Sequence, residues 1–71
     1  MTIGDNLALD RALESLVDKH GIADVVDSLA SICGEKGEHV ETNWQDEKLS
    51  GQWYAVCDKL QKVYHAAALI A

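Results

Sequence analysis

The residues best suited to chemistry gather in one short segment, ICGEKGEHVE, near the middle of the chain. Within nine residues it holds a cysteine, three glutamates and a histidine: Cys33, Glu35, Glu38, His39 and Glu41. Glu35 and His39 are four apart, so on a helix they share a face and could hold a divalent metal. Glu38 and His39 are adjacent and point about 100° apart, so they do not easily join one site.

A complete metal site needs more ligands than this segment supplies. Di-iron bundles carry a glutamate three residues before a histidine on each of two helices, with further glutamates from the other two. The chain has no such set, so we expect no metal and no cofactor and interpret the segment as polar helix surface. Cys33, Cys57 and His39 keep an alternative open, a sensor that responds to metal or to thiol oxidation.

Enzymatic motifs are also missing from the sequence. No serine lies in a nucleophile-elbow pattern, and no glycine-rich loop follows a strand. An active site needs a pocket of roughly 300 Å³ or more, which three short helices rarely enclose. We therefore predict that the protein is not an enzyme and has no catalytic residue.

The charge of the chain is negative and unevenly distributed. The net charge is −6, which argues against direct binding to nucleic acid, where Lys and Arg supply the affinity. Residues 21–43 carry five acids against one base. These acids are Asp24, Asp27, Glu35, Glu38 and Glu41. They form either a solvated surface that keeps the protein soluble or a binding face for a basic partner.

The leading functional prediction is a small acidic interaction module that binds, inhibits or regulates another protein through this acidic segment. One version is a phage or mobile-element inhibitor, whose carboxylates occupy the phosphate positions on a nucleic-acid-binding protein. Besides the sensor, a further alternative is a structural subunit of a larger assembly.

The elements that position these residues are predicted to be helices. The 71 residues include no proline and are 48% hydrophobic and 25% charged, a composition that favours an all-α domain spanning 1–71. We expect helices over about 5–19, 22–42 and 46–68, with Asp5 or Asn6 capping the first and Gly21 ending it. Gly34 and Gly37 mark either a weak point in the second helix or a place of close approach.

Heptad spacing predicts that the second and third helices form an antiparallel hairpin, the core of a small three-helix bundle. The apolar positions of the third helix are Leu49, Trp53, Val56, Leu60, Val63 and Ala67. Those of the second are Ile22, Val26, Leu29, Cys33 and Val40. The heptad position between Cys33 and Val40, where an apolar residue is expected, is occupied by Lys36. This register sets Cys33 opposite Val56 and Lys36 opposite Trp53. Trp44 and Trp53 are then expected to close the core, Trp53 against the aliphatic stem of Lys36.

Size and terminal sequences suggest an assembly state and a location. A 71-residue helical chain is marginally stable alone. A homodimer through the first helix and the apolar end HAAALIA is therefore one expectation, beside a monomer. The sequence shows neither a signal peptide nor an apolar run of about 20 residues, so we expect a cytoplasmic protein without a membrane partner.

Two consecutive segments carry a family resemblance. HGIADVVDSLASIC followed by EKGEHVETNWQDEKLSGQW resembles a group of small uncharacterised helical proteins of bacteria and their phages, over about residues 19–53. The most specific positions are His20, Gly21, Asn43, Trp44, Gln45, Asp46 and Trp53. The resemblance implies a bacterial or phage cytoplasmic origin and carries no activity or ligand.

Overall fold

A computed structural model describes residues 7–70 of the chain. These residues form three helices, α1 (Leu7–His20), α2 (Ile22–Trp44) and α3 (Glu47–Ala67), and no strand. The prediction of an all-α fold with three helices is therefore confirmed. The expected caps of the first helix, Asp5 and Asn6, lie outside the described residues. None of the three helices has the length and apolar character that a membrane crossing requires.

Local backbone chemistry explains where the helices end. Gly21 separates α1 from α2 with a φ of 88°, a left-handed conformation that glycine adopts without strain, and its N–H donates to the carbonyl of Val17 at 2.7 Å. α2 continues two residues beyond its predicted end, and Gln45 follows it with a φ of 52°. The carboxylate of Asp46 caps α3 by accepting the N–H of Leu49 at 3.0 Å.

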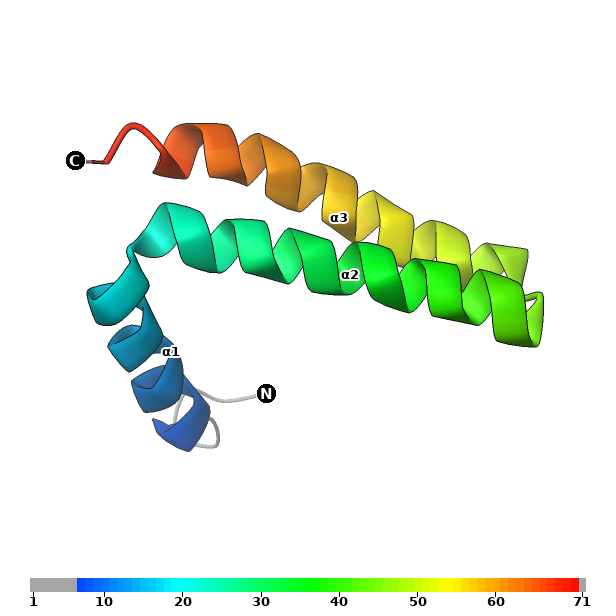
Figure 1. Ribbon diagram of the computed structural model, residues 1–71, viewed down its shortest axis with the longest axis horizontal. Coiled ribbons are helices and arrows are strands. Elements are labelled where there is room, and N and C mark those ends of the chain that lie inside the picture. Colours follow the sequence, from blue (N-terminus) through cyan, green and yellow to red (C-terminus); the bar gives the residue numbers. More distant parts are fainter. Residues whose placement is uncertain (1–6, 71) are drawn as a thin grey trace.

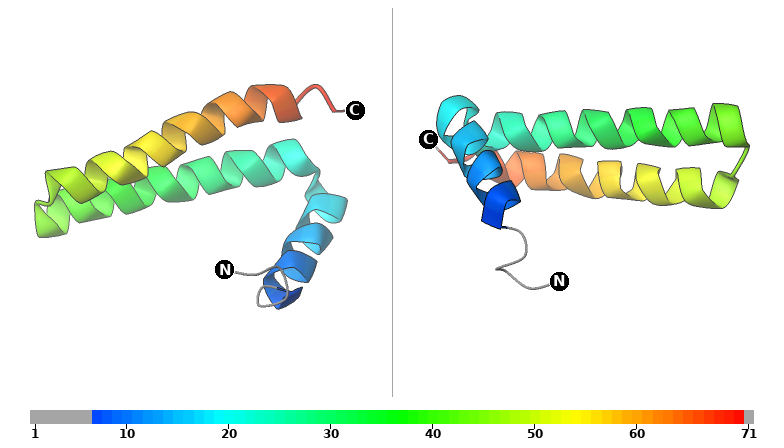
Figure 2. Two further views of the ribbon diagram at one scale, coloured as in Figure 1. Left: turned by 180° about the vertical axis from the view of Figure 1, so that it is seen from behind. Right: turned by 90° about the horizontal axis from the view of Figure 1, so that it is seen from below.

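The arrangement of the helices is open. α3 runs back beside α2 along its whole length, whereas α1 leaves the start of α2 at a steep angle (Figures 1 and 2). Among the described residues, α1 approaches α2 but not α3. The radius of gyration is 14.1 Å, compared with about 11 Å for a compact chain of this length. The packed part of the fold is therefore the pair of helices α2 and α3.

Small side chains fill the contact between α2 and α3. The buried residues of the pair are Val26, Ala30, Cys33 and Gly37 on α2 and Ser50 and Ala67 on α3. On α2 they follow a 4-3-4 spacing, which places them on one narrow stripe. Ser50 is buried without an unpaired hydroxyl, because its Oγ donates to the carbonyl of Glu47 at 3.1 Å. The contact between α2 and α3 is therefore stabilised more by the close approach of the two helices than by burial of large apolar side chains.

The predicted register is wrong by one residue on each helix. Gly34 faces the thiol of Cys57, where Cys33 was expected opposite Val56. Gly37 faces Tyr54, where Lys36 was expected opposite Trp53. Three positions of the predicted contact, Val26, Cys33 and Ala67, are buried as expected. Because successive residues are about 100° apart on a helix, the change in register nevertheless moves the centre of the contact around each helix. The large apolar residues of the predicted contact, Leu29, Leu49, Val56 and Val63, are 39–50% exposed as a result.

The predicted closure of the core by tryptophans is also largely wrong. Trp44 is 72% exposed, because α2 continues through it and it does not fold back from a turn. Lys36 is exposed as well. Trp53 is half-buried, and its Cβ lies 3.2 Å from the place that a Cβ on Gly37 would occupy. Only Trp53 therefore contributes to the contact between the helices.

Candidate partner-binding surfaces

The five acids predicted to bind a partner lie together on α2. Asp24, Asp27, Glu35, Glu38 and Glu41 are all exposed. At about 100° per residue they fall within an arc of about 120° around the helix, on the side that faces away from Leu29 and Ile32. We call these five residues the acidic arc. At about 1.5 Å per residue they extend over roughly 26 Å of helix length.

Tyr54 of α3 belongs to the same surface, although no motif in the sequence singles it out. Desolvation raises the pKa of its phenol, and so do the nearby carboxylates of Glu41 and Glu38. The phenol therefore lies beside the C-terminal part of the acidic arc. This proximity also shows which side of α3 adjoins the arc.

The His39 side chain lies against a neighbour on its own helix, Asn43. Asn43 donates through its side-chain nitrogen Nδ2 to the carbonyl of His39 at 3.0 Å, and the same nitrogen lies 3.0 Å from the ring Nδ1 of His39. Glu35 and Glu38 line a shallow hollow beside this pair. Nowhere along residues 7–70 do three His, Cys, Asp or Glu side chains gather as a metal site would require. The pair of Glu35 and His39 therefore has no third ligand there.

The residues of the predicted sensor, Cys33, Cys57 and His39, are divided between two surfaces. Cys33 is buried between α2 and α3, and Cys57 is a half-buried free thiol on the facing helix. The Sγ of Cys57 lies 3.9 Å from the side-chain nitrogen Nε2 of Gln61. His39 lies on the exposed side of α2. The two thiols share the helix contact, and the histidine belongs to a different surface.

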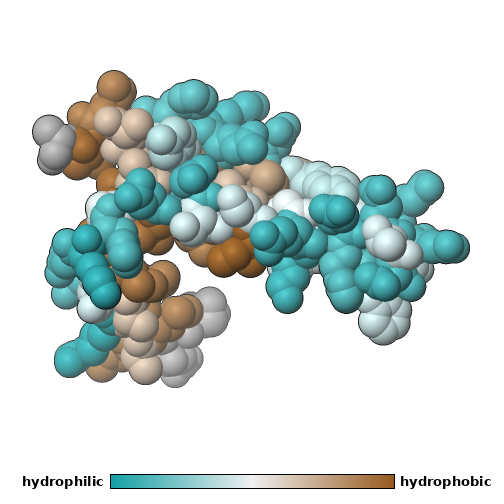
Figure 3. All heavy atoms as spheres, in the orientation of Figure 1, coloured by the Kyte–Doolittle hydropathy of each residue, from teal (hydrophilic) through white to brown (hydrophobic). Residues whose placement is uncertain are grey.

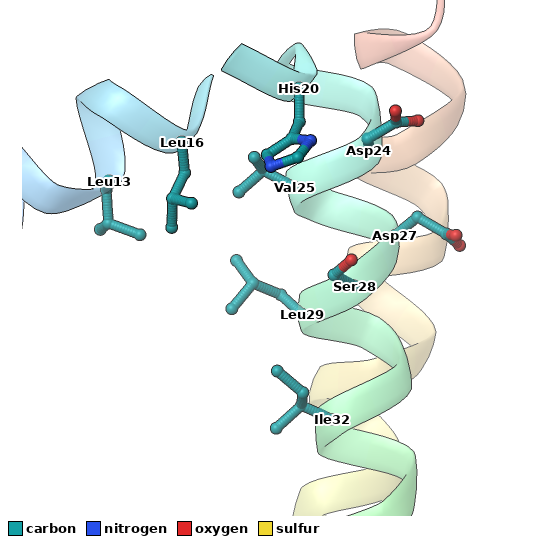
Figure 4. Close-up of a pocket in the computed structure, with 9 residues that line it drawn as sticks. All are labelled: Leu13, Leu16, His20, Asp24, Val25, Asp27, Ser28, Leu29 and Ile32. Atoms are coloured by element: carbon teal, nitrogen blue, oxygen red, sulfur yellow. The ribbon is translucent and has the colours of Figure 1, made fainter. Parts of the chain in front are cut away.

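An apolar groove of about 470 Å³ opens between α1 and α2. The leucine stripe of α1 forms one wall, and apolar side chains of α2 form the other. The apolar residues that line it are Leu13, Leu16, Val25, Leu29 and Ile32. In Figure 4 these side chains point into the space between the helices, whereas Asp24 and Asp27 point away from α1. Figure 3 shows apolar surface on α1 and on the part of α2 that faces it.

A second apolar hollow, of about 270 Å³, lies on α3. Leu49, Gln52, Trp53 and Val56 line it. Sequence reasoning assigned Leu49, Trp53 and Val56 to the buried contact, because spacing alone does not distinguish a buried stripe from an adjacent exposed one.

Comparisons with family models, curated proteins and solved structures found no match to this chain.

Proposed function

We propose that this protein is an acidic interaction module that binds another protein of basic surface and thereby inhibits or regulates it. The observation that carries the proposal is the acidic arc, five exposed carboxylates on one side of a single helix. Only one base, Lys36, lies among them in the sequence. The antiparallel hairpin of α2 and α3 serves as the scaffold that keeps the arc straight.

The physical basis of recognition is electrostatic. Exposed carboxylates contribute little to the stability of the chain that carries them. Arranged in a row, however, they create a negative potential that accelerates the approach of a basic partner. In the most specific form of the proposal, the carboxylates of the acidic arc occupy a surface of the partner protein that otherwise binds nucleic-acid phosphates. In this role the protein acts in the cytoplasm and performs no catalytic step.

Affinity purification from native cells with a matched pair of variants tests this function. One variant neutralises the arc with Asp24→Asn, Asp27→Asn, Glu35→Gln, Glu38→Gln and Glu41→Gln. The control neutralises five acids on α1 and α3 with Asp10→Asn, Glu14→Gln, Asp18→Asn, Glu47→Gln and Asp58→Asn. Each variant removes five negative charges, so the two have the same net charge.

Mass spectrometry should identify one basic protein that the wild type and the control retain and the arc variant loses. Equal retention by all three proteins would contradict the proposal. Equal loss from both variants would show that net charge, and not the arc, governs the association.

A further inference from the structure

The pair of helices α2 and α3 has an apolar side without a cover. On α2, Val25, Leu29 and Ile32 project from the side that faces away from the acidic arc. On α3, Leu49, Val56 and Val63 project from the side that faces away from Tyr54. Because Tyr54 adjoins Glu41 of the arc, the two apolar flanks lie on the same side of the pair. We call these six residues the apolar face.

The chain as a whole exposes more surface than a compact monomer of its size. The chain exposes 5719 Å², whereas a compact protein of 7.8 kDa exposes about 4400 Å². The difference of about 1300 Å², taken over the whole chain, is larger than the roughly 800 Å² that each partner contributes to a standard interface. Among residues 7–70, the buried hydrophobic side chains are only Val26, Ala30, Cys33 and Ala67.

α1 carries the complementary feature. Its leucine stripe consists of Leu9, Leu13 and Leu16, which are 36–54% exposed. No residue of α1 is buried. In its own chain this stripe meets α2 only across the open groove (Figure 4). Each chain therefore carries both an uncovered apolar helix and an uncovered apolar face.

Self-complementarity points to a second copy as the occupant, because each chain carries both the exposed leucine stripe and the exposed apolar face. Two chains of net charge −6 repel each other overall, so contact between copies is least opposed at surfaces without carboxylates. All six residues of the apolar face are uncharged. Asp24 and Asp27 of the acidic arc border the groove beside this face, but their carboxylates point away from α1 (Figure 4). A symmetric pair of chains uses the same patches twice, once in each direction.

We infer that two copies form a two-fold dimer in which α1 of each chain packs on the apolar face of the other. This arrangement covers both apolar features at once. It also leaves the acidic arcs of both copies accessible, so it does not depend on the partner proposed above. The dimer would present two arcs on opposite outer sides.

Sedimentation equilibrium of the full chain tests this inference with paired substitutions. The wild type should have twice the 7.8 kDa mass of the chain. Leu13→Glu on α1 and Val56→Glu on α3 should each weaken the dimer by at least about tenfold, because each buries an unpaired carboxylate. Ser15→Glu and Ala55→Glu add the same charge to the same helices outside the two patches and should leave the mass unchanged. A monomeric wild type would overturn the inference, and so would dimers that tolerate both Leu13→Glu and Val56→Glu.

A second measurement covers the case in which the charged variants fail to fold. Folding coupled to dimerisation makes the melting temperature rise with protein concentration. Thermal unfolding of the wild type from low to high micromolar concentration should show this rise, and a constant melting temperature would overturn the dimer. The arc-neutralised variant should keep the dimer mass, so failure of the dimer and failure of partner binding are distinguishable.

Discussion

Gly37 of α2 lies against the ring of Tyr54 on α3. A Cβ built on Gly37 would be 2.7 Å from Cε1 of that ring and 3.2 Å from the Cβ of Trp53. The first distance is well below van der Waals contact, so only glycine permits this approach. The local helix loses about 1 kcal/mol of propensity relative to alanine at this position, and the close packing of the two helices offsets that loss.

Replacement of this glycine should destabilise the protein. Gly37→Ala forces Tyr54 and Trp53 to move, and we expect a net loss of about 1–3 kcal/mol, the usual range for overpacking. Gly51→Ala on α3 is the matched control, because no atom lies within 4 Å of its added Cβ. That control should gain up to about 1 kcal/mol from helix propensity. Urea unfolding followed by circular dichroism measures both changes, and equal effects would show that the contact is not tight.

The two tryptophans should differ in their contribution to stability. Trp44→Ala removes a side chain that is 72% exposed, so its effect should stay within about 0.5 kcal/mol. Trp53→Ala should cost about 2 kcal/mol, less than the 3–5 kcal/mol of a fully buried aromatic because the ring is only half-buried. Unfolding curves at one protein concentration give the comparison. A larger loss from Trp44→Ala than from Trp53→Ala would contradict this description of the core.

The sequence was sufficient to predict the helices but not the faces by which they pack. Gly21 and the missing proline predicted three helices, and the structure confirms three. Two stripes lie side by side on α3, one with Leu49, Val56 and Val63, the other with Ser50, Cys57 and Tyr64. Hydrophobicity favoured the first stripe for the core, whereas in the structure Ser50 of the second stripe is buried and Cys57 and Tyr64 are half-buried. Small side chains at the contact, such as Ser50 and Gly37, permit the close approach of the helices.

The candidate site was predicted only in part. The acids of the arc could be identified because charge is visible in composition and their exposure follows from it. The groove between α1 and α2 could not, because it depends on the angle at Gly21, which no spacing encodes. The 4-3-4 series of Val26, Ala30, Cys33 and Gly37 was the signal that could have identified the true contact.

Tyr54 should titrate above its ordinary pKa of 10.0, because desolvation and the carboxylates of Glu41 and Glu38 disfavour its anion. The unfolded chain then releases this proton first, so the contribution of Tyr54 to stability is present below pH 10 and is lost as the pH rises through the raised value. Tyrosinate absorbance of a Tyr64→Phe variant measures the pKa of Tyr54. Glu41→Gln should lower it, whereas Glu35→Gln on the far side of the arc should not.

The two thiols should react at different rates in the native protein. Cys33 is buried in the helix contact and Cys57 is half-buried, and thiols in apolar surroundings react slowly. We expect slow alkylation of Cys33 and faster alkylation of Cys57, measured by peptide mass spectrometry during a time course with iodoacetamide. If Cys33 and Cys57 are alkylated at equal rates in urea and also at equal rates in the native protein, the contact between α2 and α3 opens faster than the thiols react.

The association rate of the captured basic partner tests the central claim, recognition by the acidic arc, most directly. Binding kinetics should be recorded at low and high ionic strength for the wild type, the arc variant and the control variant with five neutralised acids on α1 and α3. We predict that neutralising the arc slows association at low salt by at least about tenfold, with a smaller change in dissociation, and that the control retains most of the wild-type rate. Equal association rates for the two variants would contradict the claim.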